Sequence, residues 1–276
     1  MKKYILDLKV TAATMAHERY VLLRLTDPSQ PLPPMLPGQF VEVRIDGSPS
    51  TFLRRPISIC FVDRQQNELW LLVACVGDGT RWLATLNRGD RLNCVLPLGN
   101  GFTMPQRLAD NAIPEQCSTT SSLPGHSIPS VLLIGGGVGV APLLYLGYVL
   151  RQNGVEPTFL LGARTSRDLL LPDEFRRYGR VLVTTEDGSE GEKGFVTNHS
   201  VLQSKFDTIY TCGPTQMMKA VARYAREHNI YCEASLENLM ACGLGACLCC
   251  VEKTRSGNLC VCKDGPVFNI EDLLWE

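Results

Sequence analysis

The sequence predicts an antiparallel β-barrel, then an α/β domain built on a parallel sheet, then a small cysteine-rich domain. Short apolar segments separated by turn residues fill the first hundred positions, and strands alternate with helices from residue 131 onward. Six of the twelve cysteines crowd into positions 242–262. We place the domains at residues 1–106, 131–232 and 233–276, with residues 107–130 as a linker or insertion.

Composition excludes several classes of protein. The chain has 276 residues, of which 45% are hydrophobic and 20% charged, which suits two globular domains and an appendage. The net charge of −1 and the lack of a basic stripe argue against a nucleic-acid partner. No apolar run is long enough to span a membrane, and Asp7 and Lys9 interrupt the only candidate signal sequence. We expect a cytoplasmic protein with reduced thiols.

The first domain is predicted from five strand-like segments bounded by turn residues. These are Tyr20–Leu25, Phe40–Ile45, Pro56–Val62, Leu69–Val76 and Arg91–Leu96. One helix is expected over residues 79–86, because Thr80, Trp82, Leu83 and Leu86 have helical spacing.

The second domain begins after residues 107–130, which are rich in serine and proline and have no apolar periodicity. Five strands and two helices are then expected, in an order typical of a parallel sheet with crossover helices. The strands are Val131–Ile134, Thr158–Leu161, Val181–Thr185, Thr208–Thr211 and Ile230–Glu233, and the helices are Ala141–Gln152 and Thr215–Glu227.

A glycine-rich turn joins the first of these strands to the first helix. Glycines let a phosphate approach the backbone, and a helix N-terminus favours negative charge. Val140 takes the place of the last glycine of the usual dinucleotide fingerprint, so a tight packing turn without a ligand remains an alternative. The candidate nucleotide-binding residues are Gly135, Gly136, Gly137 and Gly139.

A second turn supports nucleotide binding, because it ends another strand at the same edge of the sheet, where ligands of open α/β sheets bind. Its residues are Cys212, Gly213 and Pro214. Cys212 can also be an ordinary buried cysteine. The choice between NAD and NADP stays open, since Arg164 suits a 2′-phosphate whereas Glu186 and Asp187 would repel one.

Two features of the first domain suggest a dinucleotide there as well. The run Arg54-Arg55-Pro56-Ile57-Ser58 opens a strand with cations for a pyrophosphate and a hydroxyl for a ring edge, although two arginines can equally form a solvated surface. The turn at residues 77–80, before the expected helix, is a second candidate phosphate-binding turn.

The cysteine loop, residues 242–250, has the spacing C-x4-C-x2-C, and a fourth cysteine follows at Cys262. This spacing matches the loop of plant-type [2Fe–2S] ferredoxins. The candidate ligands are therefore Cys242, Cys247, Cys250 and Cys262. Zinc is the alternative, but it prefers paired C-x2–4-C knuckles, and Cys260-Val261-Cys262 is a poor second knuckle. Cys249 and Cys260 are expected to be bystander thiols.

Taken together, these motifs resemble a known family, the electron-transfer subunits of the two-subunit, NAD-linked dihydroorotate dehydrogenases (class 1B) of the ferredoxin-reductase superfamily. The resemblance covers nearly the whole chain. Besides the motifs above it rests on Gly99-Asn100-Gly101-Phe102, on Met240-Ala241 before the cysteine loop, and on residues 261–268.

The resemblance implies an FAD-binding barrel, an NAD-binding α/β domain and a C-terminal [2Fe–2S] domain. It implies that FAD is bound by Arg55, Pro56, Ile57, Ser58, Leu72, Val73, Ala74, Gly79 and Thr80. It also implies an FMN-containing dihydroorotate dehydrogenase catalytic subunit as partner in pyrimidine biosynthesis, in a heterotetramer with two copies of each subunit. Electrons would pass from that FMN through the cluster and FAD to NAD⁺.

The sequence is also compatible with two other functions. A related flavin and iron–sulfur subunit can serve a hydrogenase or a ferredoxin-NADP transhydrogenase. A zinc-stabilised nucleotide-binding module without enzymatic activity is the more distant alternative.

Overall fold

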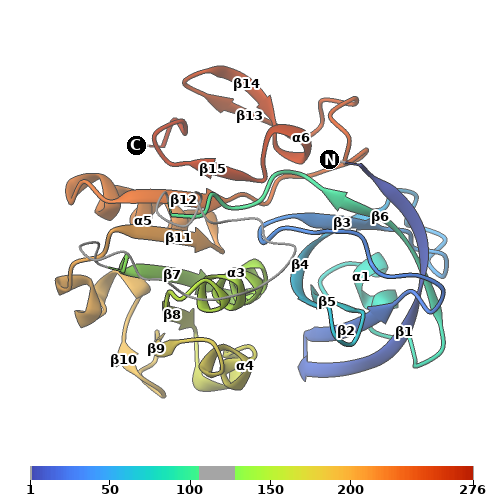
Figure 1. Ribbon diagram of the computed structural model, residues 1–276, viewed down its shortest axis with the longest axis horizontal. Helices are drawn as coiled ribbons and strands as arrows, with labels where there is room; N and C mark the ends of the chain where they lie inside the picture. The colour runs from blue at the N-terminus through green and yellow to red at the C-terminus, as the bar shows by residue number, and fades with distance from the viewer. Residues whose placement is uncertain (1, 106–127, 276) are drawn as a thin grey trace.

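The computed structural model describes residues 2–105 and 128–275, which form three parts (Figure 1). A barrel lies on one side, a parallel-sheet domain on the other, and the C-terminal segment lies along the edge that they share. The linker expected at residues 107–130 falls largely outside the described residues.

The barrel consists of six antiparallel strands that close in the order β1-β2-β5-β4-β3-β6. This confirms the fold expected for the first domain. The strands are β1 (Tyr4–His17), β2 (Tyr20–Thr26), β3 (Phe40–Val43), β4 (Arg55–Asp63), β5 (Glu68–Ala74) and β6 (Arg91–Leu98). Helix α1 (Asp78–Leu83) follows β5, where the sequence predicts a helix.

Strand β1 is missing from the sequence prediction, although its pattern contains a signal. Leu8 and Val10 are fully buried, while the intervening Lys9 is exposed. This two-residue alternation is typical of a strand with one face in the core. Without β1 the barrel cannot close, because β1 pairs with both β2 and β6.

The second domain is a seven-stranded sheet in the order β10-β9-β8-β7-β11-β12-β15. All neighbours are parallel except β12 and β15. Its strands are β7 (Val131–Gly136), β8 (Thr158–Ala163), β9 (Arg180–Thr185), β10 (Glu192–Lys193), β11 (Thr208–Cys212), β12 (Tyr231–Ser235) and β15 (Val267–Asn269). Strand β12 runs past the boundary expected at residue 232, and β15 joins from the C-terminal segment.

Helices cover both faces of the sheet. They are α3 (Ala141–Gln152), α4 (Pro172–Arg176) and α5 (Thr215–Glu227), with short 3₁₀ turns η1 (Gly137–Val140), η2 (Ser166–Asp168), η3 (Val196–Asn198) and η4 (Ser200–Gln203). On the α3 side, one continuous apolar core joins the sheet to the barrel. Phe61 of β4 packs against Tyr148 of α3, with ring centroids 5.1 Å apart, so the two domains are fixed against each other.

The C-terminal segment packs on the second core, together with α5. It contains a hairpin, β13 (Val251–Thr254) and β14 (Gly257–Cys260), then the short helix α6 (Val261–Asp264). Cys250, Val261 and Phe268 belong to the same buried cluster as Val221 and Ala225 of α5. The cysteine-rich segment is therefore docked on the sheet.

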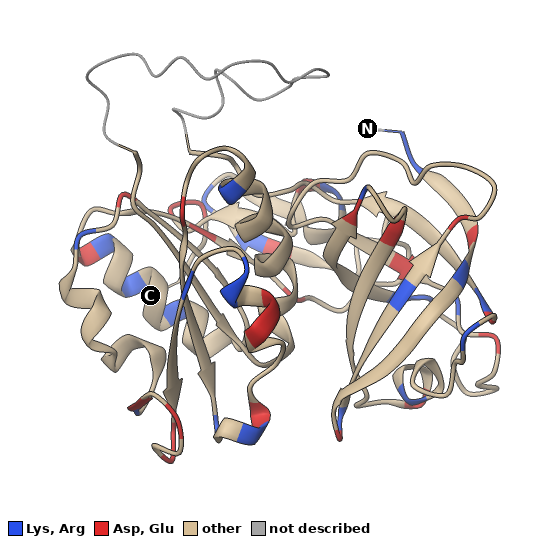
Figure 2. Cartoon of the chain, turned by 60° about the horizontal axis from the view of Figure 1, so that its bottom comes forward, with Lys and Arg blue, Asp and Glu red and all other residues tan. Residues whose placement is uncertain are grey.

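Charged side chains are distributed without a dominant sign. Figure 2 shows basic and acidic residues interspersed over both domains, consistent with the net charge of −1. Within the described residues, no helix is long and apolar enough to cross a membrane.

Candidate functional site

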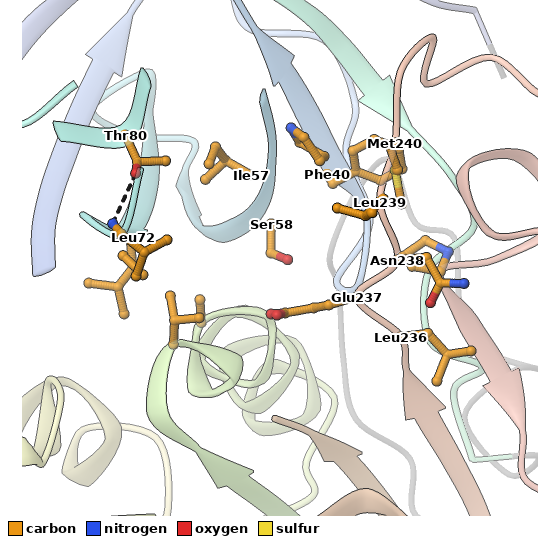
Figure 3. A pocket seen from close by; sticks show the side chains of 16 residues that line it. Phe40, Ile57, Ser58, Leu72, Thr80, Leu236, Glu237, Asn238, Leu239 and Met240 are labelled. Carbon is orange, nitrogen blue, oxygen red and sulfur yellow. Dashed lines mark hydrogen bonds between the residues drawn. The ribbon is translucent and has the colours of Figure 1, made fainter. Parts of the chain in front are cut away.

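A cavity of about 420 Å³, which we call the pocket, lies where barrel, sheet domain and C-terminal segment meet (Figure 3). It is mostly apolar, with a few polar groups, as ligand-binding pockets usually are. Six residues expected to bind FAD line it: Pro56, Ile57, Ser58, Leu72, Ala74 and Thr80. The other lining residues are Phe40, Val76, Val138, Ala141, Leu236, Glu237, Asn238, Leu239, Met240 and Pro266.

Three other residues expected to bind FAD do not line the pocket. Val73 is fully buried in the barrel core. Gly79 is also buried, and a methyl group in place of its hydrogen would lie 3.0 Å from the Thr51 side chain. Arg55 opens β4, where its guanidinium donates to the Leu53 and Arg54 carbonyls, each at 3.2 Å. FAD contacts of these three residues stay predictions.

The side chain of the adjacent Arg54 forms hydrogen bonds within the barrel. Its guanidinium donates to the Glu42 and Asn93 carbonyls and, at 2.5 Å, to the Asn93 side-chain oxygen. These bonds hold the start of β4 against β3 and β6.

The turn before α1 is held by the Thr80 hydroxyl. It accepts hydrogen bonds from the backbone N–H groups of Val76 and Gly77, at 3.1 and 3.0 Å. Because Val76 and Thr80 both line the pocket, this turn is fixed at its rim (Figure 3).

The two turns expected to bind a nucleotide pack directly on each other at the carboxyl edge of the sheet. A methyl group on Gly139 would lie 2.4 Å from the Gly213 Cα atom, so no larger residue fits without displacing the second turn. Gly137 has a φ of +55°, which favours glycine. Next to this contact lie the other residues of the two turns, Gly135, Gly136, Cys212 and Pro214. Val138, between two of the glycines, lines the pocket, so the nucleotide turns and the pocket adjoin.

One wall of the pocket, residues 236–240 between β12 and the cysteine loop, is not predicted from the sequence. Neither periodicity nor a turn signal marks this segment. A weak signal existed, because Met240 belongs to the motif through which the chain resembles the family. The missed wall includes Glu237, whose carboxylate points into the cavity (Figure 3).

The four candidate cluster ligands lie in two neighbouring pairs. The Cys242 sulfur is hydrogen-bonded by Cys247, and the Cys262 thiol interacts with Cys250. Cys250 and Cys262 are each 2% exposed, whereas Cys247 is open to solvent. One pair therefore faces the protein interior and the other lies nearer the surface.

Chain topology explains why Cys262 returns to the cysteine loop. The hairpin β13–β14 begins after Cys250 and ends at Cys260, and the Val261 N–H donates to the Cys250 carbonyl at 3.1 Å. Asn100 of the barrel then holds the following turn, because its amide donates to the Asp264 carbonyl at 2.9 Å.

Backbone N–H groups of the segment point at the sulfur atoms. Leu244 donates to Cys242 at 3.3 Å, Gly245 to Cys262 at 3.1 Å, and Cys262 to Cys250 at 3.3 Å. Such bonds stabilise negative charge on thiolates. Although partial burial opposes ionisation of Cys242, hydrogen bonds from Leu244, Cys247 and Ala246 outweigh it and lower the pKa of its thiol to about 6. Burial raises the pKa of Cys262 to about 12.

Glycines allow the loop to bend this tightly. Gly243 and Gly245 have φ angles of +64° and +80°. A side chain at Gly243 would collide with Glu42 at 2.7 Å, and one at Gly245 with Lys263 at 2.7 Å.

The arrangement fits a two-iron cluster. In the described part of the chain, no three Cys, His, Asp or Glu side chains are close enough to share one metal ion. A [2Fe–2S] cluster does not require such a trio, because each iron takes only two protein ligands. Cys249 is exposed, and the Cys260 N–H donates to the Asp264 carboxylate at 2.8 Å. Their role as bystanders stays a prediction.

Family models match two parts of the chain. Residues 237–274 match the iron-sulfur cluster binding domain of dihydroorotate dehydrogenase B, and residues 133–223 match the oxidoreductase NAD-binding domain. The chain is 37% identical to the dihydroorotate dehydrogenase B (NAD(+)) electron transfer subunit of Shouchella clausii, over 86% of both chains. It is 40% identical to that of Lysinibacillus sphaericus, over 85% of both.

Solved structures share the fold. The chain superposes on an NADH-dependent reduced ferredoxin-NADP oxidoreductase structure with a TM-score of 0.79 and 29% identity, covering 97% of this chain and 90% of the other. A ferredoxin reductase of carbazole 1,9a-dioxygenase matches with a TM-score of 0.65 and 18% identity, covering 83% and 67%. The identity and coverage of the curated relatives show that this chain belongs to the family of electron transfer subunits of dihydroorotate dehydrogenase B.

Proposed function

We propose that this chain passes electrons between the FMN of a dihydroorotate dehydrogenase catalytic subunit and NAD⁺, through a [2Fe–2S] cluster and an FAD. The observation that carries this proposal is a shared segment. Residues 236–240 line the pocket and lead directly into Cys242, and Pro266, just after Cys262, lines the pocket too. A cluster on the cysteine loop and a ring in the pocket would therefore be neighbours.

The described residues suit these roles. Residues 56–58 of β4 and residues 72 and 74 of β5 offer an apolar wall to a flavin ring, with the Ser58 hydroxyl among them. The turn held by Thr80, together with Arg55 at the start of β4, would receive the pyrophosphate. The glycine turns at residues 135–139 and 212–214 would receive NAD(H). When bound, the flavin converts single electrons into the two-electron transfer that nicotinamide needs.

A catalytic subunit would dock over the cysteine loop. Leu244 and Leu248 expose 47% and 63% of their surface beside the candidate ligands, and Leu239 exposes 85%. Exposed apolar side chains that follow one another closely along the chain favour an interaction surface. We propose a heterotetramer with two copies of each subunit, acting in the cytoplasm in pyrimidine biosynthesis.

A transhydrogenase subunit is the second candidate, because the NADH-dependent reduced ferredoxin-NADP oxidoreductase structure matches nearly the whole chain. The two candidates differ in the partner protein that they require. The transhydrogenase alternative predicts association with a ferredoxin-linked partner, whereas our proposal predicts association with an FMN-containing dihydroorotate dehydrogenase.

The test is co-expression of the chain with such a catalytic subunit, followed by purification and an assay of NAD⁺ reduction that depends on dihydroorotate. The proposal predicts a brown-yellow complex that reduces NAD⁺ only when both subunits are present. A chain that contains neither flavin nor iron, or a complex inactive with NAD⁺, would contradict it.

A further inference from the structure

Strand β3 carries a single charged side chain, that of Glu42, and it is only 1% exposed. Its neighbours along the strand, Val41 and Val43, belong to the core that fills the barrel. Because side chains alternate between the two faces of a strand, Glu42 lies on the same face as Phe40, away from the barrel interior. Phe40 belongs to the same buried cluster as Cys262. Glu42 therefore lies on the face of β3 that packs against the C-terminal segment.

The Glu42 carboxyl group is buried without a partner. Among the described residues, neither of its oxygens has a hydrogen-bond partner. Arg54 is close enough to attract a negative charge on Glu42, but its guanidinium donates to the Glu42 and Asn93 carbonyls and to the Asn93 side-chain oxygen instead. Burial of a carboxyl group without a hydrogen bond costs stability, so its presence calls for an explanation in the function of the protein.

This carboxyl group lies against the cysteine loop. A methyl group on Gly243 would lie 2.7 Å from the Glu42 Cγ atom and 3.0 Å from its Oε1 atom. Gly243 directly follows the candidate ligand Cys242, and negative charge on the Cys242 sulfur acts on Glu42. The loop that would hold the cluster thus has an uncompensated acid packed against its backbone.

The charged groups around Glu42 do not cancel its charge. Burial raises the pKa of its carboxyl group to about 7 although Arg54 acts in the opposite direction, and Cys242 raises this pKa as well. Arg55, beside Arg54 at the start of β4, lowers it by a smaller amount. In alkaline solution the group is ionised, and it then places a negative charge beside the cysteine loop.

We propose that Glu42 lowers the reduction potential of the cluster held by the cysteine loop. This inference rests on the proposed function. A buried negative charge repels an electron added to the cluster, and such surroundings screen the repulsion much less than water does. The net charge around an iron–sulfur cluster is one of the factors that set its potential. The cluster then passes its electron more readily to the flavin, so Glu42 favours electron flow toward NAD⁺.

The test is a potentiometric titration of the holoprotein, followed by the electron paramagnetic resonance signal of the reduced cluster. The titration is run at about pH 9, where the carboxyl group is ionised. Glu42→Gln removes the charge but keeps the shape, and Glu42→Asp keeps the charge. Glu18→Gln is the control, because Glu18 is exposed and follows the far end of β1.

We expect Glu42→Gln to raise the midpoint potential of the cluster. The equilibrium constant for its one-electron reduction should rise by about tenfold, which corresponds to about 59 mV. The shift should be smaller in Glu42→Asp, and Glu18→Gln should match the wild type.

Equal midpoint potentials in the wild type and Glu42→Gln overturn the inference. Loss of the cluster from Glu42→Gln overturns it too, because Glu42 would then be a structural support of the loop. Both results leave the proposed function in place. A wild type that holds no iron–sulfur cluster overturns the proposed function itself.

Discussion

The candidate cluster ligands all come from residues 242–262, whereas the pocket takes its walls from residues spread between Phe40 and Pro266. The cysteine loop is local in sequence and depends on backbone geometry, namely tight glycine bends and N–H groups aimed at sulfur. The pocket is assembled by the packing of three parts of the fold. Changes to the loop should therefore remove one cofactor selectively, and changes to domain packing should affect nucleotide binding and stability together.

The largest effect is expected from Cys250→Ser. Cys250 is buried, and its sulfur accepts a hydrogen bond from the Cys262 N–H, so a serine there should abolish cluster assembly. We expect near-complete loss of bound iron and of electron transfer from the partner, with FAD content and NADH–dye activity retained.

The matched control is Cys249→Ser, at the adjacent exposed position, which should keep its iron. Equal iron loss in both variants would show that the loop tolerates no change at all. Loss of FAD in Cys250→Ser would break the distinction between loop and pocket.

The next effect is expected from Gly139→Ala, because the added methyl group would lie 2.4 Å from the Gly213 Cα atom. Separating the two turns should destabilise the fold by about 1–3 kcal/mol and raise the KM for NADH, while iron content stays normal. Thermal denaturation and NADH–dye kinetics measure both. An unchanged KM would argue against nucleotide binding at these turns.

A smaller effect is expected from Asn100→Ala, which removes the side-chain bonds that hold the turn after Cys262. The loss should cost about 1 kcal/mol, and the cluster should be lost faster to an iron chelator. FAD content should not change. If chelation proceeds at the wild-type rate, the barrel does not support the cysteine loop through this contact.

The smallest effect is a pH dependence at Glu233, which joins the end of the barrel to β12 by accepting hydrogen bonds from the Thr103 N–H at 2.9 Å and the Tyr231 hydroxyl at 2.8 Å. Burial raises the pKa of Glu233 despite these bonds. Between the ordinary pKa of 4.5 and the raised pKa of the folded state, the folded state binds more protons than the unfolded state. Stability should therefore fall as the pH rises from the lower of these two pKa values to the higher.

Melting temperatures of the wild type and Glu233→Gln across that pH range test this. The variant should lose this component of the pH dependence. Parallel curves would show that Glu233 does not titrate differently in the folded state.

The difference between the cysteine loop and the pocket also decides how much of each could be predicted from the sequence. Cysteine spacing identifies the four candidate ligands because the chemistry needs particular residues at particular intervals. Strand and helix patterns predicted most elements, but β1 was overlooked despite its alternation. The wall at residues 236–240 carries no local pattern, because β12 and the cysteine loop decide where it lies. Arg54 is the opposite case. Its charge suggested a contact with a ligand, whereas its hydrogen bonds to Glu42 and Asn93 hold strands of the barrel together.

The central claim is that the pocket and the cysteine loop form one electron path within this chain. Anaerobic addition of NADH to the purified holoprotein, followed by visible absorbance and electron paramagnetic resonance, tests it most directly. We predict bleaching of the flavin together with the resonance signal of a reduced [2Fe–2S] cluster, and in Cys250→Ser bleaching without that signal. A wild type that contains the full cluster, and whose flavin bleaches while the cluster stays oxidised, would contradict the account.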